Sequence, residues 1–187
     1  NRTVPAVPIP RHLCPTPMRF TFTEDTALES SRFSCLKALS ETQVDVGLTS
    51  STSPRSRFLL AIHENGSPIM HIPPRPVLGP ALSSASAQTD ITSALMDAAS
   101  VAMDGDEPGM NAALEAAGEA GVDAIHAYID AGVPPPNSPV TVSGGWIYNR
   151  IAKTGVSVKG KGFNKPLYDT GALYNDFDFE VKSRDQK

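Results

Sequence analysis

The residues with the clearest chemical potential lie near the carboxyl end, in the stretch PLYDTGALYNDFDFEV of residues 166–181. It contains Asp169, Thr170 and Gly171 after an apolar pair, as the catalytic D-T-G sequence of aspartic proteases does. That chemistry needs two carboxylates that share one proton about 3 Å apart, the second of which a retroviral-type subunit obtains by dimerising. It also needs a flap and further strands behind the active-site loop. Only 18 residues follow Asp169, which is room for one strand, so a protease is the disfavoured alternative.

A structural interpretation explains the same three residues. Asp and Thr side chains accept hydrogen bonds from nearby backbone N–H groups, and Gly allows a positive φ. Asp169, Thr170 and Gly171 are then a rigid turn that leads into the last strand, and we expect no catalytic residue.

Two further motifs stop short of a metal site. The stretch HENGS at 63–67 begins like the zinc motif H-E-x-x-H, but Ser67 stands where the second histidine belongs. Residues 104–115 partly match a calcium-binding loop, yet Pro108 occupies a ligand position and suits the first turn of a helix better. Neither a G-x-G-x-x-G sequence nor a Walker loop is present, so no metal and no cofactor are predicted.

The composition favours a single, non-membrane protein domain. The chain has 187 residues and a net charge of −4, which gives no general attraction to nucleic acid or anionic membranes. Its two cysteines, Cys14 and Cys35, have neither CxxC spacing nor the paired histidines of a zinc site and are expected to be free thiols. No apolar run approaches the ~20 residues of a membrane span, and prolines interrupt the amino-terminal apolar residues, so we expect a soluble cytoplasmic protein.

The pattern of apolar residues predicts an α+β fold with a small antiparallel sheet packed by two or three helices. Strands are expected at 18–23, 42–50 and around Phe177–Val181, and a short helix is expected to end at Gly66. Further helices are expected over 26–40, 90–105 and 107–132. Their apolar faces contain Leu28, Phe33, Leu36 and Leu39; then Ile91, Leu95, Ala98 and Ala102; then Met110, Leu114, Ala117, Gly121, Ile125 and Tyr128.

The connecting segments are predicted from prolines and glycines. Residues 1–17 carry five prolines and form an extended arm ahead of one domain, residues 18–187. Prolines at 73, 74, 76 and 80 exclude a helix and a central strand, which makes 71–84 a stiff crossing segment. Residues 132–145 are a turn-rich connector, and about 144–165 are an extended basic loop. Within the longest helix, Gly118 and Gly121 indicate either close approach of another backbone or simple tolerance.

The charges are distributed unevenly between two segments. Residues 104–130 contain seven acidic residues and no Lys or Arg, whereas residues 150–165 contain five basic residues and no acidic one. Two solvated surfaces explain this asymmetry. A head-to-tail contact between identical subunits also explains it, with the basic loop of one on the acidic helix of the next, and a third interpretation directs the loop at DNA. The residues of this predicted interface are Arg150, Lys153, Lys159, Lys161, Lys165, Glu115, Glu119 and Asp123.

Four segments resemble, in the same order, those of a known family. They are LLAIHENGSP (59–68), HIPPRPVLGPAL (71–82), PPNSPVT (135–141) and KGKGFNKPLYDTGALYNDFDFEV (159–181). The family is that of small minor structural proteins of tailed bacteriophages, the neck or tail-completion proteins of the head–tail junction, which Mu-like and other prophages also encode. Asn65, Gly79, Asp176 and Phe177 depart from the family pattern, and residues 1–25 match none of it.

The resemblance implies a non-enzymatic virion protein that forms a homo-oligomeric ring at the head–tail junction and assembles in the bacterial host cytoplasm. It implies contacts with portal or adaptor and tail proteins, and DNA that passes through the bore without sequence-specific binding. An extended loop would reach neighbouring subunits. Carried over by position, Pro73, Arg75 and Pro76 shape the crossing segment, and Pro166, Leu167, Asp169, Thr170 and Gly171 form the turn before the last strand. A monomeric DNA-binding adaptor is a further alternative.

Overall fold

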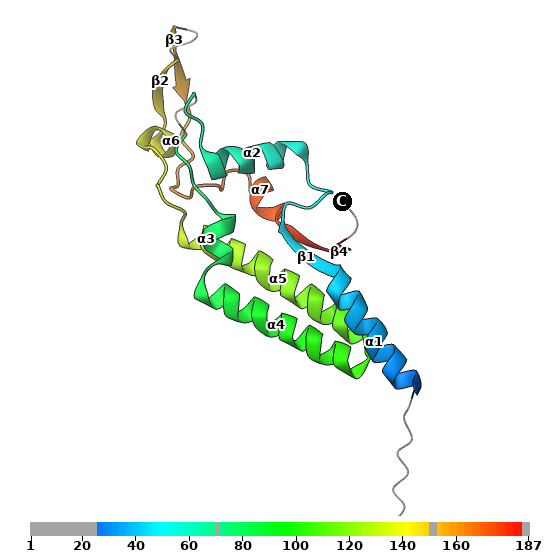
Figure 1. The fold of residues 1–187 in the computed structure, drawn as a ribbon. Coiled ribbons are helices and arrows are strands. Elements are labelled where there is room, and N and C mark those ends of the chain that lie inside the picture. The colour runs from blue at the N-terminus through cyan, green and yellow to red at the C-terminus, as the bar shows by residue number, and fades with distance from the viewer. Residues whose placement is uncertain (1–25, 70–71, 150–152, 185–187) are drawn as a thin grey trace, which may run out of the picture.

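Two long antiparallel helices form the centre of the molecule (Figure 1). In the computed structural model, which describes residues 26–69, 72–149 and 153–184, these are α4 (Ala85–Asp104) and α5 (Glu107–Ala131). Gly105, with φ 80°, has the left-handed conformation that ends α4. Asp106 caps α5, since its carboxylate accepts a hydrogen bond of 3.1 Å from the Gly109 N–H.

The predicted long helix is confirmed as α5, but α4 begins earlier than predicted. The helix was predicted to begin at residue 90, whereas its cap is Ser84, whose hydroxyl accepts from the Ala87 N–H at 3.3 Å. The extra turn contains small and polar residues without a marked apolar period. The capping serine was therefore the only residue in the sequence that marked this helix start, and serine is too common to predict a helix start by itself.

A two-stranded antiparallel sheet lies across α5. Strand β1 (Thr42–Gly47) pairs with β4 (Asp178–Ser183), with Val44 opposite Val181 and Val46 opposite Phe179. The sheet approaches α5 at its two internal glycines. A Cβ atom at Gly118 would stand 2.3 Å from Phe179 Cδ2, and one at Gly121 would stand 2.9 Å from Val46 Cγ2. Close approach of the sheet to α5 therefore explains these glycines. The atoms that come close belong to side chains of the sheet and not to another backbone.

Five shorter helices complete the described fold, which is α+β as predicted. The buried residues form two clusters along α5, one around Ile125, Ile129 and Phe177 and the other around Met110, Leu114 and Ala98. The first cluster contacts the carboxyl half of α5 and the second its amino half. The five shorter helices are α1 (Thr26–Glu41), α2 (Pro54–Asn65), α3 (Leu78–Leu82), α6 (Pro139–Ser143) and α7 (Ala172–Asn175).

The predicted buried face of α1 is wrong. Leu28, Phe33 and Leu36 are exposed, and the buried residue is Cys35. Cys35 belongs to the cluster shared with α4 and α5, and half-buried Leu39 packs against it. The small thiol faces the neighbouring helix, which leaves the larger side chains on a surface that no described element covers.

Two proline-rich segments contain short helices that were not predicted. Pro80 lies in α3, because the first turn of a helix has N–H groups without intrahelical partners and tolerates proline. The same reasoning applies to Pro139 at the start of α6, inside the predicted connector. The crossing segment is therefore extended only up to Val77.

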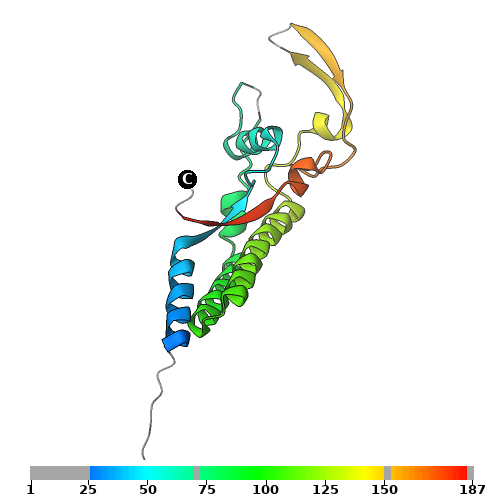
Figure 2. The same cartoon turned by 90° about the vertical axis from the view of Figure 1, so that its right-hand side faces the viewer.

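The predicted basic loop is a β-hairpin. Strand β2 (Gly145–Asn149) pairs antiparallel with β3 (Thr154–Val158), and Figure 2 shows the two strands projecting from the body at the end opposite α1. Trp146, Ile147 and Tyr148 have high strand propensity, which the glycine and lysine content of the segment obscured. The predicted arm 1–17, the strand 18–23 and Arg150 lie outside the described residues.

Candidate functional site

The D-T-G corner connects the hairpin to the last strand. Gly171 has φ 81° and stands just before α7, and its carbonyl accepts a hydrogen bond of 2.9 Å from the Asn175 N–H. The Thr170 hydroxyl accepts one of 3.4 Å from the Ala172 N–H. Leu167 also has a positive φ, 64°, which is unusual for a residue with a branched side chain. The corner is thus a sharp reversal of the chain, and α7 separates it from β4.

The Asp169 carboxylate points outward and meets a lysine. Its side chain is 73% exposed, and Oδ1 lies 3.6 Å from Lys161 Nζ. The same ammonium group donates a hydrogen bond of 3.1 Å to the Tyr168 carbonyl. An aspartic protease needs a second carboxylate with which to share a proton. In the described chain the charged group next to Asp169 is instead the Lys161 ammonium group.

A cluster of charges and rings fastens the corner to the end of α5. Lys165 Nζ lies 2.6 Å from Asp130 Oδ1, and it stands over the rings of Tyr168 and Tyr174, 4.7 and 5.6 Å from their centroids. The Tyr174 hydroxyl donates to Asp130 Oδ2 at 3.1 Å. His126, one turn earlier on α5, stacks on Tyr174 with centroids 4.2 Å apart. We call Asp130, His126, Lys165, Tyr168 and Tyr174 the anchor cluster.

The protonation behaviour of the anchor cluster follows from these contacts. The hydrogen bonds from Lys165 and then from Tyr174 lower the pKa of Asp130. The hydrogen bond from Lys165 to Asp130 raises the pKa of Lys165, and burial followed by the separate hydrogen bond from the Tyr174 hydroxyl to Asp130 raises the pKa of Tyr174. All three shifts favour the charged pair and the neutral phenol at neutral pH.

Asp130→Asn is expected to lower the melting temperature modestly at pH 7, and this difference is expected to shrink as the pH falls below about 4. The folded pKa of Asp130 is lowered, so its stabilisation is present above the ordinary carboxyl pKa of about 4 and disappears as the pH falls through the lowered value. Thermal melts of both proteins between pH 7 and 3 measure this difference. Asp123→Asn, at an exposed position on the same helix, serves as the control. A difference between Asp130→Asn and the parent that persists unchanged at pH 3 would contradict the assignment.

The crossing segment is held by Arg75, which is buried. Its Nε donates to the Pro135 carbonyl at 2.8 Å and Nη2 donates to the Pro136 carbonyl at 3.1 Å. The planar guanidinium thus joins two segments about 60 residues apart, and a lysine could not reproduce its fork of donors. Pro73 and Pro74 precede this residue and Pro76 follows it, which keeps the backbone extended.

The H-E pair of the failed zinc motif supports the same segment. The Glu64 carboxylate accepts from the Val77 and Leu78 N–H groups at 2.8 and 2.9 Å, which caps α3. Burial, then the nearby charges of Arg75 and Lys161, lower the pKa of His63. Glu64 therefore has a structural role. No group of three His, Cys, Asp or Glu side chains that could hold a metal ion occurs in the described part of the chain.

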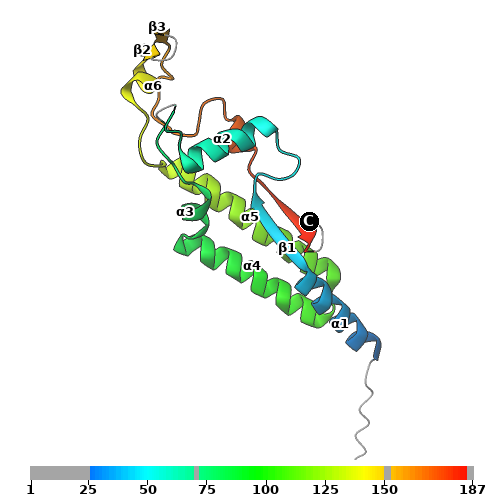
Figure 3. The ribbon, with the colours of Figure 1, turned by 45° about the horizontal axis from the view of Figure 1, so that its top comes forward.

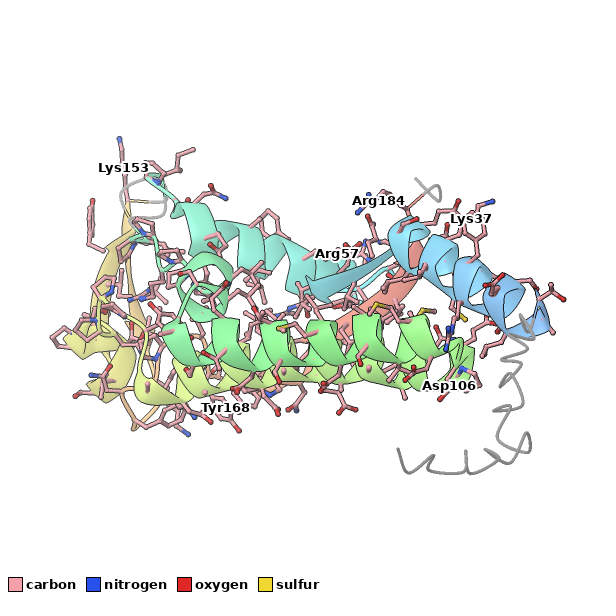
Figure 4. All side chains as sticks on the ribbon, turned by 60° about the horizontal axis from the view of Figure 1, so that its bottom comes forward. Lys37, Arg57, Asp106, Lys153, Tyr168 and Arg184 are labelled. Atoms are coloured by element: carbon pink, nitrogen blue, oxygen red, sulfur yellow. The ribbon has the colours of Figure 1, made fainter. Side chains whose placement is uncertain are left out.

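The predicted interface residues divide into two groups. Glu115, Glu119 and Asp123 are exposed in an i, i+4, i+8 row on α5, and Lys153 and Lys159 are exposed on the hairpin and just after it. Lys161 and Lys165 are instead paired within the subunit, as described above. Figure 4 shows Lys153 at one end of the molecule and Lys37 of α1 at the other.

The hairpin has an exposed apolar surface that was not predicted from the sequence. Trp146 is 74% exposed and Tyr148 is 64% exposed, and the two share one face of the hairpin. Ile147, Val156 and Val158 are exposed on the other face. Alternation of Trp146 with Tyr148 and of Val156 with Val158 was the signal that could have found it.

Comparison with known proteins leaves the family of this chain open. None of the helices in the described ranges is long and apolar enough to cross a bilayer. The chain matches no protein-family model, no curated protein and no solved structure.

Proposed function

We propose that this protein is a structural subunit of the head–tail junction of a tailed bacteriophage and acts by forming a homo-oligomeric ring. The observation that carries the self-assembly is the projecting hairpin, which has apolar side chains on both faces. A two-stranded hairpin is at best marginally stable alone. Exposed aromatic side chains of this kind are typical of protein interfaces.

The head–tail location comes from the resemblance of the four sequence segments. Arg75 joins two of them, the crossing segment and the connector, and the anchor cluster joins a third, the D-T-G corner, to the end of α5 from which the connector leaves. The hairpin leaves the body between the connector and the corner. The resembling residues thus position a projecting element for a neighbouring subunit.

Charge offers a second contribution to the contact. The acidic row Glu115, Glu119 and Asp123 and the lysines Lys153 and Lys159 lie on different parts of the molecule, as a head-to-tail contact between identical subunits requires. Such exposed pairs affect association rate and orientation more than affinity. The apolar hairpin would therefore supply most of the binding energy.

Two measurements on the purified protein test this function. Mass photometry and negative-stain imaging over a range of concentrations are expected to show closed rings. Asp169→Asn is expected to change stability or assembly, with no peptide cleavage by either protein. Pepstatin-sensitive hydrolysis of a polypeptide, lost in Asp169→Asn, would support the protease instead. Salt-sensitive DNA binding by a protein that stays monomeric would support the DNA-binding adaptor.

A further inference from the structure

A second apolar surface lies far from the hairpin, beside strand β1. It is a groove of about 360 Å³ whose walls come from α1, β1, α3, α4 and α5 but not from β4. It is therefore on the side of β1 that faces away from its partner strand, toward α4 (Figure 3). Its apolar lining includes Leu39, Val44, Val46, Ile91, Leu95 and Leu114.

The same side of β1 has unpaired backbone groups. Within the described chain β1 pairs only with β4, so one of its edges is free. The Arg184 N–H donates to the Glu41 carbonyl at 2.6 Å, which fixes the alternation of the antiparallel ladder. By that alternation the peptide groups of Gln43 and Asp45 face β4, and those of Val44 and Val46 face the free edge. An extended segment can pair there and place alternate side chains in the groove.

The chain contains one segment outside the described residues with the required pattern. Residues 18–23 read MRFTFT, in which Phe20 and Phe22 alternate with polar residues. A strand of this pattern presents both rings on one face. The groove volume is at the lower end of the range for pockets that enclose small molecules, ~300–1,000 Å³, which leaves room for aromatic rings.

The length of α1 separates this segment from the groove of its own subunit. Leu39 is 13 residues beyond Thr26, where α1 begins, so the groove lies about 20 Å along the helix axis at 1.5 Å per residue. Phe22 is four residues before Thr26 and reaches at most about 14 Å at 3.4 Å per residue. Phe20 reaches about 20 Å only when fully extended, with no residue left to pair along β1.

We therefore propose that residues 18–23 of one subunit add as a third strand to the free edge of β1 in the next, with Phe20 and Phe22 in its groove. The proposal rests on the self-assembly described under the proposed function. It joins two different surfaces of identical subunits, so it is a heterologous contact that closes a ring when the rotation allows. Main-chain hydrogen bonds along β1 would set the register, and the two rings would fill the apolar space.

Cross-linking between labelled subunits tests the contact directly. Full-length protein with the photoreactive p-benzoylphenylalanine in place of Phe22 is prepared in ¹⁴N and ¹⁵N forms, mixed before assembly and irradiated. We expect linked peptides that join residue 22 to residues 42–46 or 88–95, including links with one partner of each isotope. Links found exclusively within a single isotope would show that the subunit covers its own groove. Links from residue 22 to any other region, the hairpin included, would equally overturn the proposal.

Matched variants separate this contact from ring formation in general. Phe20→Ser/Phe22→Ser and Leu95→Lys are each expected to raise the concentration for half-assembly at least tenfold. Val7→Ser/Ile9→Ser, elsewhere in the amino-terminal segment, and Met96→Lys, next to Leu95 but outside the groove lining, are expected to change it less than twofold. Circular dichroism checks that all four remain folded. If rings form and test variants match controls, the strand exchange is wrong and the proposed function stands. If the parent protein never assembles, both are wrong.

Discussion

Replacing Trp146 and Tyr148 together with serine is expected to leave the protein folded and largely monomeric. Both side chains are mostly exposed in the subunit, so their joint removal should change the free energy of unfolding by no more than about 1 kcal/mol. Buried aromatic anchors at an interface typically contribute 2 kcal/mol or more each. The association constant of each subunit contact should thus fall at least about 100-fold.

Sedimentation velocity or mass photometry at several concentrations measures this loss, with thermal melts as the check on folding. Phe58→Ser is the control, because Phe58 is an aromatic residue on α2 with 65% exposure. It should assemble as the parent protein does. Rings of normal mass and stability from the double variant would remove the hairpin from the interface and with it the main support for the proposed function.

Gly118→Ala is expected to lower the free energy of unfolding by about 2 kcal/mol, although alanine is the better helix former. The new methyl group would stand 2.3 Å from Phe179 Cδ2, 2.4 Å from Cγ and 3.0 Å from Cβ. These atoms are the base of the ring, which cannot move aside without shifting β4. Overpacking of this kind costs about 1–3 kcal/mol, which outweighs the gain of up to about 1 kcal/mol in helix propensity.

Chemical denaturation measures the effect, and Gly79→Ala is the matched control. Gly79 is also helical, and apart from its own chain neighbours no atom lies within 4 Å of a Cβ built there, so its replacement should destabilise the protein less than Gly118→Ala does. In a Phe179→Ala background the cost of Gly118→Ala should disappear, which a double-mutant cycle detects as a coupling energy. An equal cost in both backgrounds would mean that the sheet does not pack on Gly118.

The amino-acid sequence by itself determined the elements whose local signals agree. The spacing of Met110, Leu114, Ala117 and Ile125 predicted the buried face of α5, and alternation predicted β1 and β4. In each case periodicity and the flanking glycines or prolines indicate the same structure. The D-T-G corner was predicted for a comparable reason, since Thr170 and Gly171 act on the backbone next to them.

Other features were decided by contacts between residues distant in the chain. The exposed face of α1 depends on which side meets α4, and a Leu/Phe pattern does not show that small Cys35 would be the buried residue. The hairpin 145–158 was predicted as a loop because glycine and lysine masked two short strands that pair only with each other. Arg75 and Lys165 are separated from their partners by 35 or more residues, so no local pattern showed that they are internal braces. Local propensity depends on neighbouring residues. Which face of a helix is buried, and which charges pair, depends on contacts that form only when the chain brings distant segments together.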